Sequence, residues 1–163
     1  MFKYTGGAMI LKIYRIRTDA KLPTRAYQMD AGLDLYYCPN GDKKLYDEKN
    51  FHIPPKESRL LSTGIKVEVP YGYMLEIKNK SGLAHKRQLL VGACVVDPGY
   101  NGELYINLHN IGQKTQIIES GEKIAQAILI PIVHCKVEEV KTDEFLNFHS
   151  KRGDGGFGST GDR

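Results

Sequence analysis

Asp97 ends an apolar run, and two turn signals, Pro98-Gly99 and Asn101-Gly102, follow it at once. Proline followed by glycine is typical of a type II turn and Asn-Gly is typical of a hairpin, so the chain is predicted to reverse here. Asp97 and Tyr100 would then lie together at the tip of a hairpin. Side chains at such a tip are held by the flanking strands and are free to face a ligand. This pair is the first candidate for a catalytic site.

A candidate anion site lies at Lys80-Ser81-Gly82, between a predicted strand and a short predicted helix. A lysine, a hydroxyl and free N–H groups at the start of a helix favour a bound anion. A serine in this place also serves simply as a helix cap, and the pattern alone does not separate the two roles. The sequence has no P-loop motif, and no Gly-x-Gly-x-x-Gly in the strand–helix context of a dinucleotide fold.

Asp34 interrupts the apolar stretch AGLDL. A solvated aspartate at a strand edge explains it, and so does a carboxylate that reaches a magnesium ion through bound water, because magnesium usually keeps several waters. The five histidines lack metal-ligand spacing, and no Gly-x-Ser-x-Gly elbow occurs. Covalent catalysis and zinc chemistry are therefore disfavoured. The remaining groups indicate a water molecule activated for attack on phosphorus.

The sequence from residue 152 onward, RGDGGFGSTGDR, has five glycines in twelve residues. It cannot bury enough apolar surface to fold alone, so one interpretation is a disordered tail. The other is an arm that wraps a phosphate-bearing ligand with its arginine and backbone N–H groups and caps a flat base with its ring. Phe157 favours the second interpretation, because a purely solubilising tail gains nothing from an aromatic ring.

Composition places these groups in one soluble domain. The chain of 163 residues is 41% hydrophobic and 26% charged, which predicts a globular protein with a real core. The net charge of +4 is spread along the chain, so a small anionic ligand is favoured over nucleic acid. Three cysteines without a C-x-x-C pair, no signal peptide pattern and no long apolar run predict a cytoplasmic protein that neither pairs disulfides nor contacts a membrane.

Alternation of apolar and polar residues dominates and predicts an all-β domain of the sandwich or small-barrel kind, with a short helix over 82–88. The apolar segment 124–130 is expected to be buried on both faces, either as a central core strand or under a neighbouring subunit. The loop 37–51 is polar and unexplained, which makes it a candidate partner surface or simply a solvated loop. Strands are predicted over 10–16, 33–37, 59–63, 65–69, 73–78, 89–96, 104–109, 117–119 and 124–133.

Five segments in order, AGLDL, KSGLAHK, VGACVVDPGYNGEL, GEKIAQAILIP and RGDGGFGSTG, resemble the motifs of the homotrimeric dUTPase family. The resemblance implies a jelly-roll-like distorted β-barrel of the β-clip type over residues 1–151 and a flexible glycine-rich arm over 152–163. It implies Mg²⁺-assisted hydrolysis of dUTP to dUMP and pyrophosphate, at three sites formed between subunits and closed by the arms.

The resemblance also assigns roles residue by residue. Asp97 resembles the general base for the attacking water, Tyr100 the ring that packs on deoxyribose, and Asp34 the carboxylate near the metal-bound waters. The remaining contacts are uracil pairing by backbone at Cys94, Val95, Val96 and Tyr105, phosphate binding by Lys80, Ser81, Gly82 and Gln126, and closure by Arg152, Phe157, Gly158 and Ser159.

The chain departs from the family pattern at three places. Lys80 and Lys123 stand where arginine is usual, so bidentate contacts become point-charge contacts. Cys94 replaces a frequent glycine, and its side chain must point away from the base. Pro98-Gly99 replaces a more acidic pair. Two other functions stay open: a dCTP deaminase of the same superfamily, including a bifunctional one, and a regulatory binding protein on the same scaffold.

Overall fold

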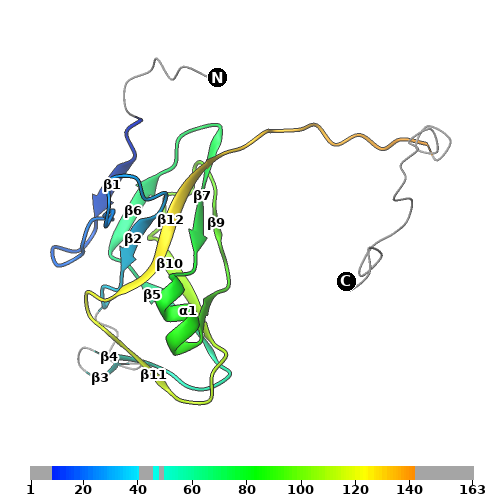
Figure 1. Ribbon diagram of the computed structural model, residues 1–163. Helices are drawn as coiled ribbons and strands as arrows, with labels where there is room; N and C mark the ends of the chain where they lie inside the picture. Colours follow the sequence, from blue (N-terminus) through cyan, green and yellow to red (C-terminus); the bar gives the residue numbers. More distant parts are fainter. Residues whose placement is uncertain (1–8, 41–45, 48–49, 142–163) are drawn as a thin grey trace. The chain divides into compact units, whose positions relative to one another are not determined.

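The computed structural model describes residues 9–40, 46–47 and 50–141 (Figure 1). The chain divides into two units, Met1–Val133 and His134–Arg163. Strands dominate the first unit, and the described part of the second, 134–141, is exposed and contains no helix or strand. The all-β prediction is confirmed. No helix in the described ranges is long and apolar enough to cross a membrane.

The strands form four antiparallel sheets, with the orders β2-β12-β7-β9, β5-β10-β8, β11-β4-β3 and β1-β6. Such short, separate sheets are those of the open, distorted jelly-roll-like fold. The elements are β1 (Lys12–Arg15), β2 (Leu33–Tyr36), β3 (Tyr46–Asp47), β4 (Asn50–Ile53), β5 (Ser58–Ser62), β6 (Ile65–Glu68), β7 (Tyr73–Lys78), α1 (Ser81–Arg87), β8 (Leu89–Val91), β9 (Val95–Val96), β10 (Tyr105–Asn110), β11 (Gln116–Glu119) and β12 (Lys123–Pro131).

The core lies where alternating strands turn their apolar side chains inward. In β6 and β10 every second residue is buried, as the alternation predicts. The helix α1 falls within one residue of its predicted bounds. The largest fully buried side chains are those of Leu35, Tyr37, Phe51, Ile53, Leu61, Ile65, Leu75, Leu89, Ile106, Leu108, Ile118 and Ile124.

The interpretation of 37–51 as one polar loop is wrong at its edges. Tyr37 and Phe51 are both buried, with ring centroids 6.0 Å apart in an edge-to-face arrangement. Phe51 and Ile53 form the buried face of β4, which pairs with β11 and with β3. The few apolar residues here were too sparse to reveal a strand, although they anchor it. The charged centre of the loop, 41–45, lies outside the described residues, so the partner-surface hypothesis stays untested.

The predicted strand 89–96 is two strands that separate at Gly92. β8 pairs with β10, whereas β9 pairs with β7 in a different sheet. Gly92 donates its N–H to the Asn107 carbonyl at 2.9 Å, and a Cβ there would lie 2.2 Å from the Asn107 side-chain oxygen. The chain therefore reverses after Asp97 as predicted, but the turn joins two sheets rather than closing a two-stranded ladder.

β12 is a central strand, between β2 and β7 (Figure 1). Its first half is buried as predicted, at Ile124, Ala125 and Ala127. Its second half is only half-buried, at Ile128 and Ile130. The prediction of burial on both faces thus holds for part of the strand in the single chain.

Candidate functional site

A pocket of about 290 Å³ opens at the turn after β9, and we call it the hairpin pocket. Five of the predicted site residues line this one cavity. They are the carboxylate Asp97, the phenols Tyr100 and Tyr105, and the two residues of β9, Val95 and Val96. Most of the remaining lining is apolar, which suits a flat base or sugar with a few polar contacts. The lining residues are Leu60, Ile77, Ala93, Val95, Val96, Asp97, Tyr100, Leu104 and Tyr105.

The turn itself has the type II geometry that Pro98-Gly99 predicts. Gly99 has φ of 86°, and the Tyr100 N–H donates to the Asp97 carbonyl at 3.3 Å. The Tyr100 hydroxyl donates to the Glu103 carbonyl at 2.8 Å, and the ring lies so close to Gly102 that a Cβ there would be 2.4 Å from the hydroxyl oxygen. The Tyr100 ring is therefore held in place. The Asp97 side chain is exposed and has no partner among the described residues.

β9 offers backbone groups to a ligand because it is the edge strand of its sheet. One side of it is used by β7, including the Ile77 N–H that donates to the Cys94 carbonyl at 2.7 Å. Ala93 and Val95 line the hairpin pocket but Cys94 does not. The Cys94 thiol therefore points away from the pocket. A base could fit here only in this case, because Cys94 stands where glycine is frequent in the family that the sequence resembles.

A second group of predicted residues surrounds Asp34, and we call it the lysine cluster: Asp34, Lys80 and Lys123. The Asp34 carboxylate, only 8% exposed, forms ion pairs with both ammonium groups, the one to Lys123 at 2.7 Å. Burial opposes ionisation of Asp34, but the hydrogen bonds from Lys123 and Lys80 outweigh it and lower the pKa of this carboxyl. Two cations and one anion leave a local positive charge suited to a phosphate.

Asp34 fits a magnesium ion only in a limited way. Within the described ranges no three metal-ligating side chains come together. Both oxygens of Asp34 already accept from lysines, so a protein-only cage is not built here. An ion carried on a triphosphate, with waters completing its shell, is compatible with a single carboxylate nearby.

Gln126 and Ser81 adjoin this cluster but differ in what they do. Gln126 pairs with Asp34 in the β12–β2 ladder, and its side-chain amide donates to the Asn79 carbonyl at 2.9 Å. Its amide thus supports the segment that leads into α1. Lys80 is the N-cap and makes no side-chain cap bond, and Ser81 is the first helical residue. Ser81 therefore does not occupy the N-cap position, and both Ser81 and Gly82 are exposed.

Asp97 and the lysine cluster lie toward opposite ends of β7, whereas the hairpin pocket extends along the strand as far as Ile77. In the β9–β7 ladder Val96 is level with Leu75, which places Asp97 near the start of β7. Lys80 follows the end of β7. With a strand rise of about 3.3 Å per residue, about six residues separate the two levels by about 20 Å. Asp97 and the lysine cluster are therefore two separate groups on the single chain.

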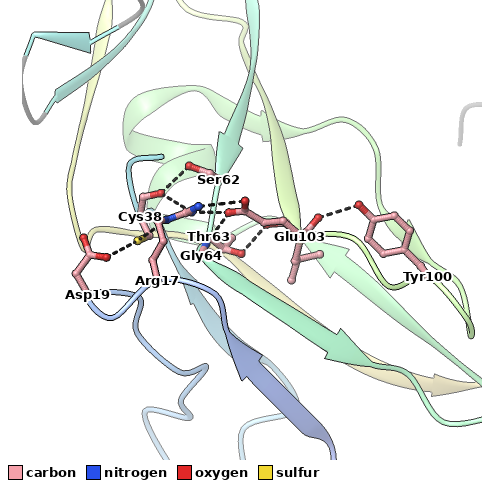
Figure 2. Close-up of polar contacts among 9 residues, drawn as sticks. Arg17, Asp19, Cys38, Ser62, Thr63, Gly64, Tyr100 and Glu103 are labelled. Atoms are coloured by element: carbon pink, nitrogen blue, oxygen red, sulfur yellow. Dashed lines mark hydrogen bonds and ion pairs between the residues drawn. The ribbon is translucent and has the colours of Figure 1, made fainter. Parts of the chain in front are cut away.

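Two site-supporting residues were missed from sequence. The Arg17 guanidinium donates from Nη1 to Glu103 at 3.1 Å and from Nη2 to the Cys38 carbonyl at 3.0 Å (Figure 2). Nothing in the pattern around Arg17 signals this contact. Glu103, directly after Asn101-Gly102, had a weak signal as a charge at the start of an apolar strand. Arg152, Phe157, Gly158 and Ser159 lie outside the described residues.

Comparison with known proteins was made for the whole chain. Residues 18–161 match the family model for dUTPase. Deoxyuridine 5'-triphosphate nucleotidohydrolases from Clostridium tetani and a Hydrogenobaculum species are 41% and 40% identical, over 93% and 94% of this chain and 96% and 99% of theirs. The fold resembles the Staphylococcus bacteriophage 80alpha dUTPase solved with dUpNHpp, with a TM-score of 0.80 and 25% identity over 94% of this chain and 99% of that one.

Proposed function

The chain belongs to the dUTPase family, and from this premise we propose that it hydrolyses dUTP to dUMP and pyrophosphate. The observation that carries the proposal is the hairpin pocket, where Asp97, the Tyr100 ring and the edge of β9 meet on one mostly apolar cavity. The related phage enzyme binds a dUTP analogue, which supports the choice of substrate.

The pocket selects the base and the sugar. The edge of β9 presents backbone donors and acceptors to a uracil ring, while Leu60 and Val95 supply apolar walls. Cytosine places an amino donor where uracil has an acceptor, so buried backbone groups would be left unpaired, a strong form of discrimination. Rejection of the thymine methyl by crowding supplies about 1–3 kcal/mol in a loose pocket and more in a tight one. The Tyr100 ring packs against deoxyribose and leaves no room for a 2′-hydroxyl.

Asp97 orients a water molecule and accepts its proton. The water oxygen forms a bond to the α-phosphorus as the bond from that phosphorus to the bridging oxygen breaks, and pyrophosphate leaves. A positioned general base contributes typically about 10²–10⁴-fold to such a step. The exposed carboxylate is available for this role because no described side chain occupies it.

The lysine cluster and the start of α1 bind the phosphates. Lys80, Ser81 and Gly82 present an ammonium group, a hydroxyl and backbone N–H groups, and Gln126 adjoins them. Lysines act here as point charges. Asp34 is the carboxylate that would lie near a Mg²⁺ ion carried on the triphosphate, and such an ion would supply charge neutralisation for the leaving group. The phage phi11 dUTPase of S. aureus coordinates a structural Mg(II) ion, which makes this metal the natural choice.

We further propose a homotrimer in which each active site combines the hairpin pocket of one chain with the lysine cluster of a neighbour. The separation of about 20 Å between the levels of Asp97 and Lys80 along β7 supports this arrangement. The half-buried second half of β12 is then free to contact another copy. Residues 152–163 form the arm that closes a site, with Arg152 on phosphate and Phe157 over uracil. Cys38, Cys94 and Cys135 form no disulfide with one another, and we propose a cytoplasmic location.

The test is pyrophosphate release from dUTP, dCTP, dTTP and UTP, each with and without Mg²⁺. We expect release from dUTP alone, with a large loss when magnesium is chelated. Ammonia release from dCTP would instead establish the deaminase function. Binding of dUTP with no release of pyrophosphate or ammonia from any nucleotide would favour the regulatory binding protein.

Deletion of residues 152–163 tests the proposed arm. We expect hydrolysis to fall strongly while thermal unfolding of the body is unchanged, because the core that the described residues form lies entirely before residue 134. Phe157→Ala in the full chain isolates the base-capping ring and should raise KM for dUTP. An unaffected rate in both variants would restore the interpretation of a disordered tail.

A further inference from the structure

We propose that Arg17 and Glu103 are positioning residues for hydrolysis: their ion pair fixes the base of the turn that carries Asp97 and Tyr100. This inference rests on the proposed function. It concerns two residues that lie outside the hairpin pocket and the lysine cluster, and that are 86 positions apart in the chain. Neither would touch the nucleotide, so each acts through the turn.

Arg17 is immobilised by several partners. Its two terminal nitrogens both donate to the Glu103 carboxylate, a bidentate arrangement that fixes orientation as well as distance. The same guanidinium donates to the Cys38 carbonyl at 3.0 Å and lies 3.4 Å from the Cys38 sulfur. The side chains of Arg17 and Glu103 are only 21% and 10% exposed, so solvent competes little for this pair.

Glu103 is also tied to the start of β6. The Gly64 N–H donates to its carboxylate at 2.8 Å. The next residue, Leu104, donates its N–H to the Ile65 carbonyl at 2.9 Å, and its own carbonyl accepts from the Thr63 hydroxyl. The end of the turn is therefore held at successive positions. Burial opposes ionisation of Glu103, but the hydrogen bonds from Arg17 and Gly64 lower the pKa of its carboxyl, which keeps the pair charged.

Tyr100 connects this anchor to the catalytic carboxylate. Its hydroxyl donates to the Glu103 carbonyl at 2.8 Å, and its N–H donates to the Asp97 carbonyl at 3.3 Å. Figure 2 shows the resulting order: Arg17, then Glu103, then Tyr100. A shift of Glu103 would be passed to both ends of the turn. A displacement of about 1 Å at a reacting group can lower turnover about 10²-fold, so firm anchoring matters here.

The experiment compares Glu103→Gln and Arg17→Lys with the control Glu57→Gln. Glu57 forms a partly exposed ion pair with Arg59, at the end of the β5–β10 ladder far from Tyr105, so its variant removes a charge pair without touching the turn. We would measure kcat and KM for dUTP, the Kd of the α,β-imido analogue dUpNHpp, and Tm. We expect kcat to fall about 10²-fold in Glu103→Gln with Kd nearly unchanged, a smaller fall in Arg17→Lys, and no change in the control.

A combined variant, Arg17→Met with Glu103→Met, separates positioning from stability. Replacing a buried ion pair by apolar side chains is often neutral or stabilising. Because the Gly64 N–H also loses its carboxylate partner, we expect a modest fall in Tm with the fold retained, and kcat still low. Wild-type kcat in the folded single or combined variants would overturn the inference. Absence of pyrophosphate release in the unmodified protein would instead overturn the proposed function, so the two failures are distinguishable.

Discussion

Asp97 combines exposure with a fixed backbone. Its carbonyl closes the turn to Tyr100, while its exposed side chain lines the hairpin pocket and has no partner in the part of the chain that the structure describes. Isosteric replacement is therefore informative, because it removes the ability to accept a proton without disturbing the turn.

In Asp97→Asn we expect turnover to fall by several orders of magnitude, since the general base alone accounts for about 10²–10⁴-fold and the orientation of the water is also lost. Binding of dUpNHpp, measured by calorimetry, should persist. Near-normal turnover would remove Asp97 from this role.

The lysine cluster predicts a pH effect. The pKa of Asp34 is lowered in the folded chain, so the stability it contributes is complete above its unfolded pKa of about 3.9 and is lost as pH falls through the lower folded pKa. Asp34→Asn should therefore unfold at a lower temperature than the wild type at pH 7, and this gap should shrink as the pH falls below 4. Thermal unfolding across pH 2.5–8 measures this difference in Tm. The control is Glu68→Gln, which removes an exposed carboxylate that pairs with Lys12. A gap that stays constant with pH would contradict the assignment.

Single site residues could be predicted from the sequence where the neighbouring residues form a recognisable motif. Asp97 and Tyr100 are marked by the turn around Pro98-Gly99, and the structure places both on one pocket. Arg17 and Glu103 meet only because β1 and the turn converge across 86 positions, and no local pattern encodes such a contact. Asp34 was singled out because it interrupts an apolar stretch, but its two lysine partners follow only from the register of β12 against β2 and β7.

Among the elements, periodicity succeeded where one face of a strand is buried. β6, β7 and β10 alternate cleanly and were predicted. β4 was missed because its burial depends on packing of Phe51 against Tyr37. The division at Gly92 was missed because it depends on Asn107, in a strand of the other sheet.

Gly64 joins β5 to β6 and predicts a difference between two glycines. Its φ is +72°, and a Cβ there would lie 2.6 Å from the Ala20 Cβ and 2.9 Å from the Cys38 sulfur. Gly64→Ala combines backbone strain with overpacking, and we expect it to lower the free energy of unfolding by about 2–5 kcal/mol.

The matched control is Gly72→Ala, where φ is +83° but nothing lies within 4 Å of an added Cβ. Gly72→Ala should lower the free energy of unfolding only through backbone strain, by about 1–2 kcal/mol. Denaturant unfolding measures both variants. Equal losses would show that the packing around Gly64 is not the limiting factor.

For the whole molecule, the two separated groups of residues predict complementation between chains. Ser81→Ala removes an exposed hydroxyl and should lower turnover about tenfold to a hundredfold if it contacts a phosphate. Unfolding Asp97→Asn and Ser81→Ala together in equal amounts and refolding them as mixed trimers should leave about a quarter of the sites with both groups intact.

Pyrophosphate release from the mixture should thus exceed the mean of the two variants refolded separately, and the weaker the Ser81→Ala enzyme, the clearer the gain. Mass measurement by light scattering would verify that trimers form. Mixed trimers with no gain in activity would place each complete site within one chain.

The two-residue length of β9 has a protective consequence. Long, exposed sheet edges act as templates on which other chains polymerise, and proteins blunt them by shortening the edge strand. An edge of two residues is too small to nucleate an intermolecular sheet but is about the width of one planar heterocycle. The protein thereby keeps backbone groups open for the base recognition that we propose, without exposing a surface that promotes aggregation.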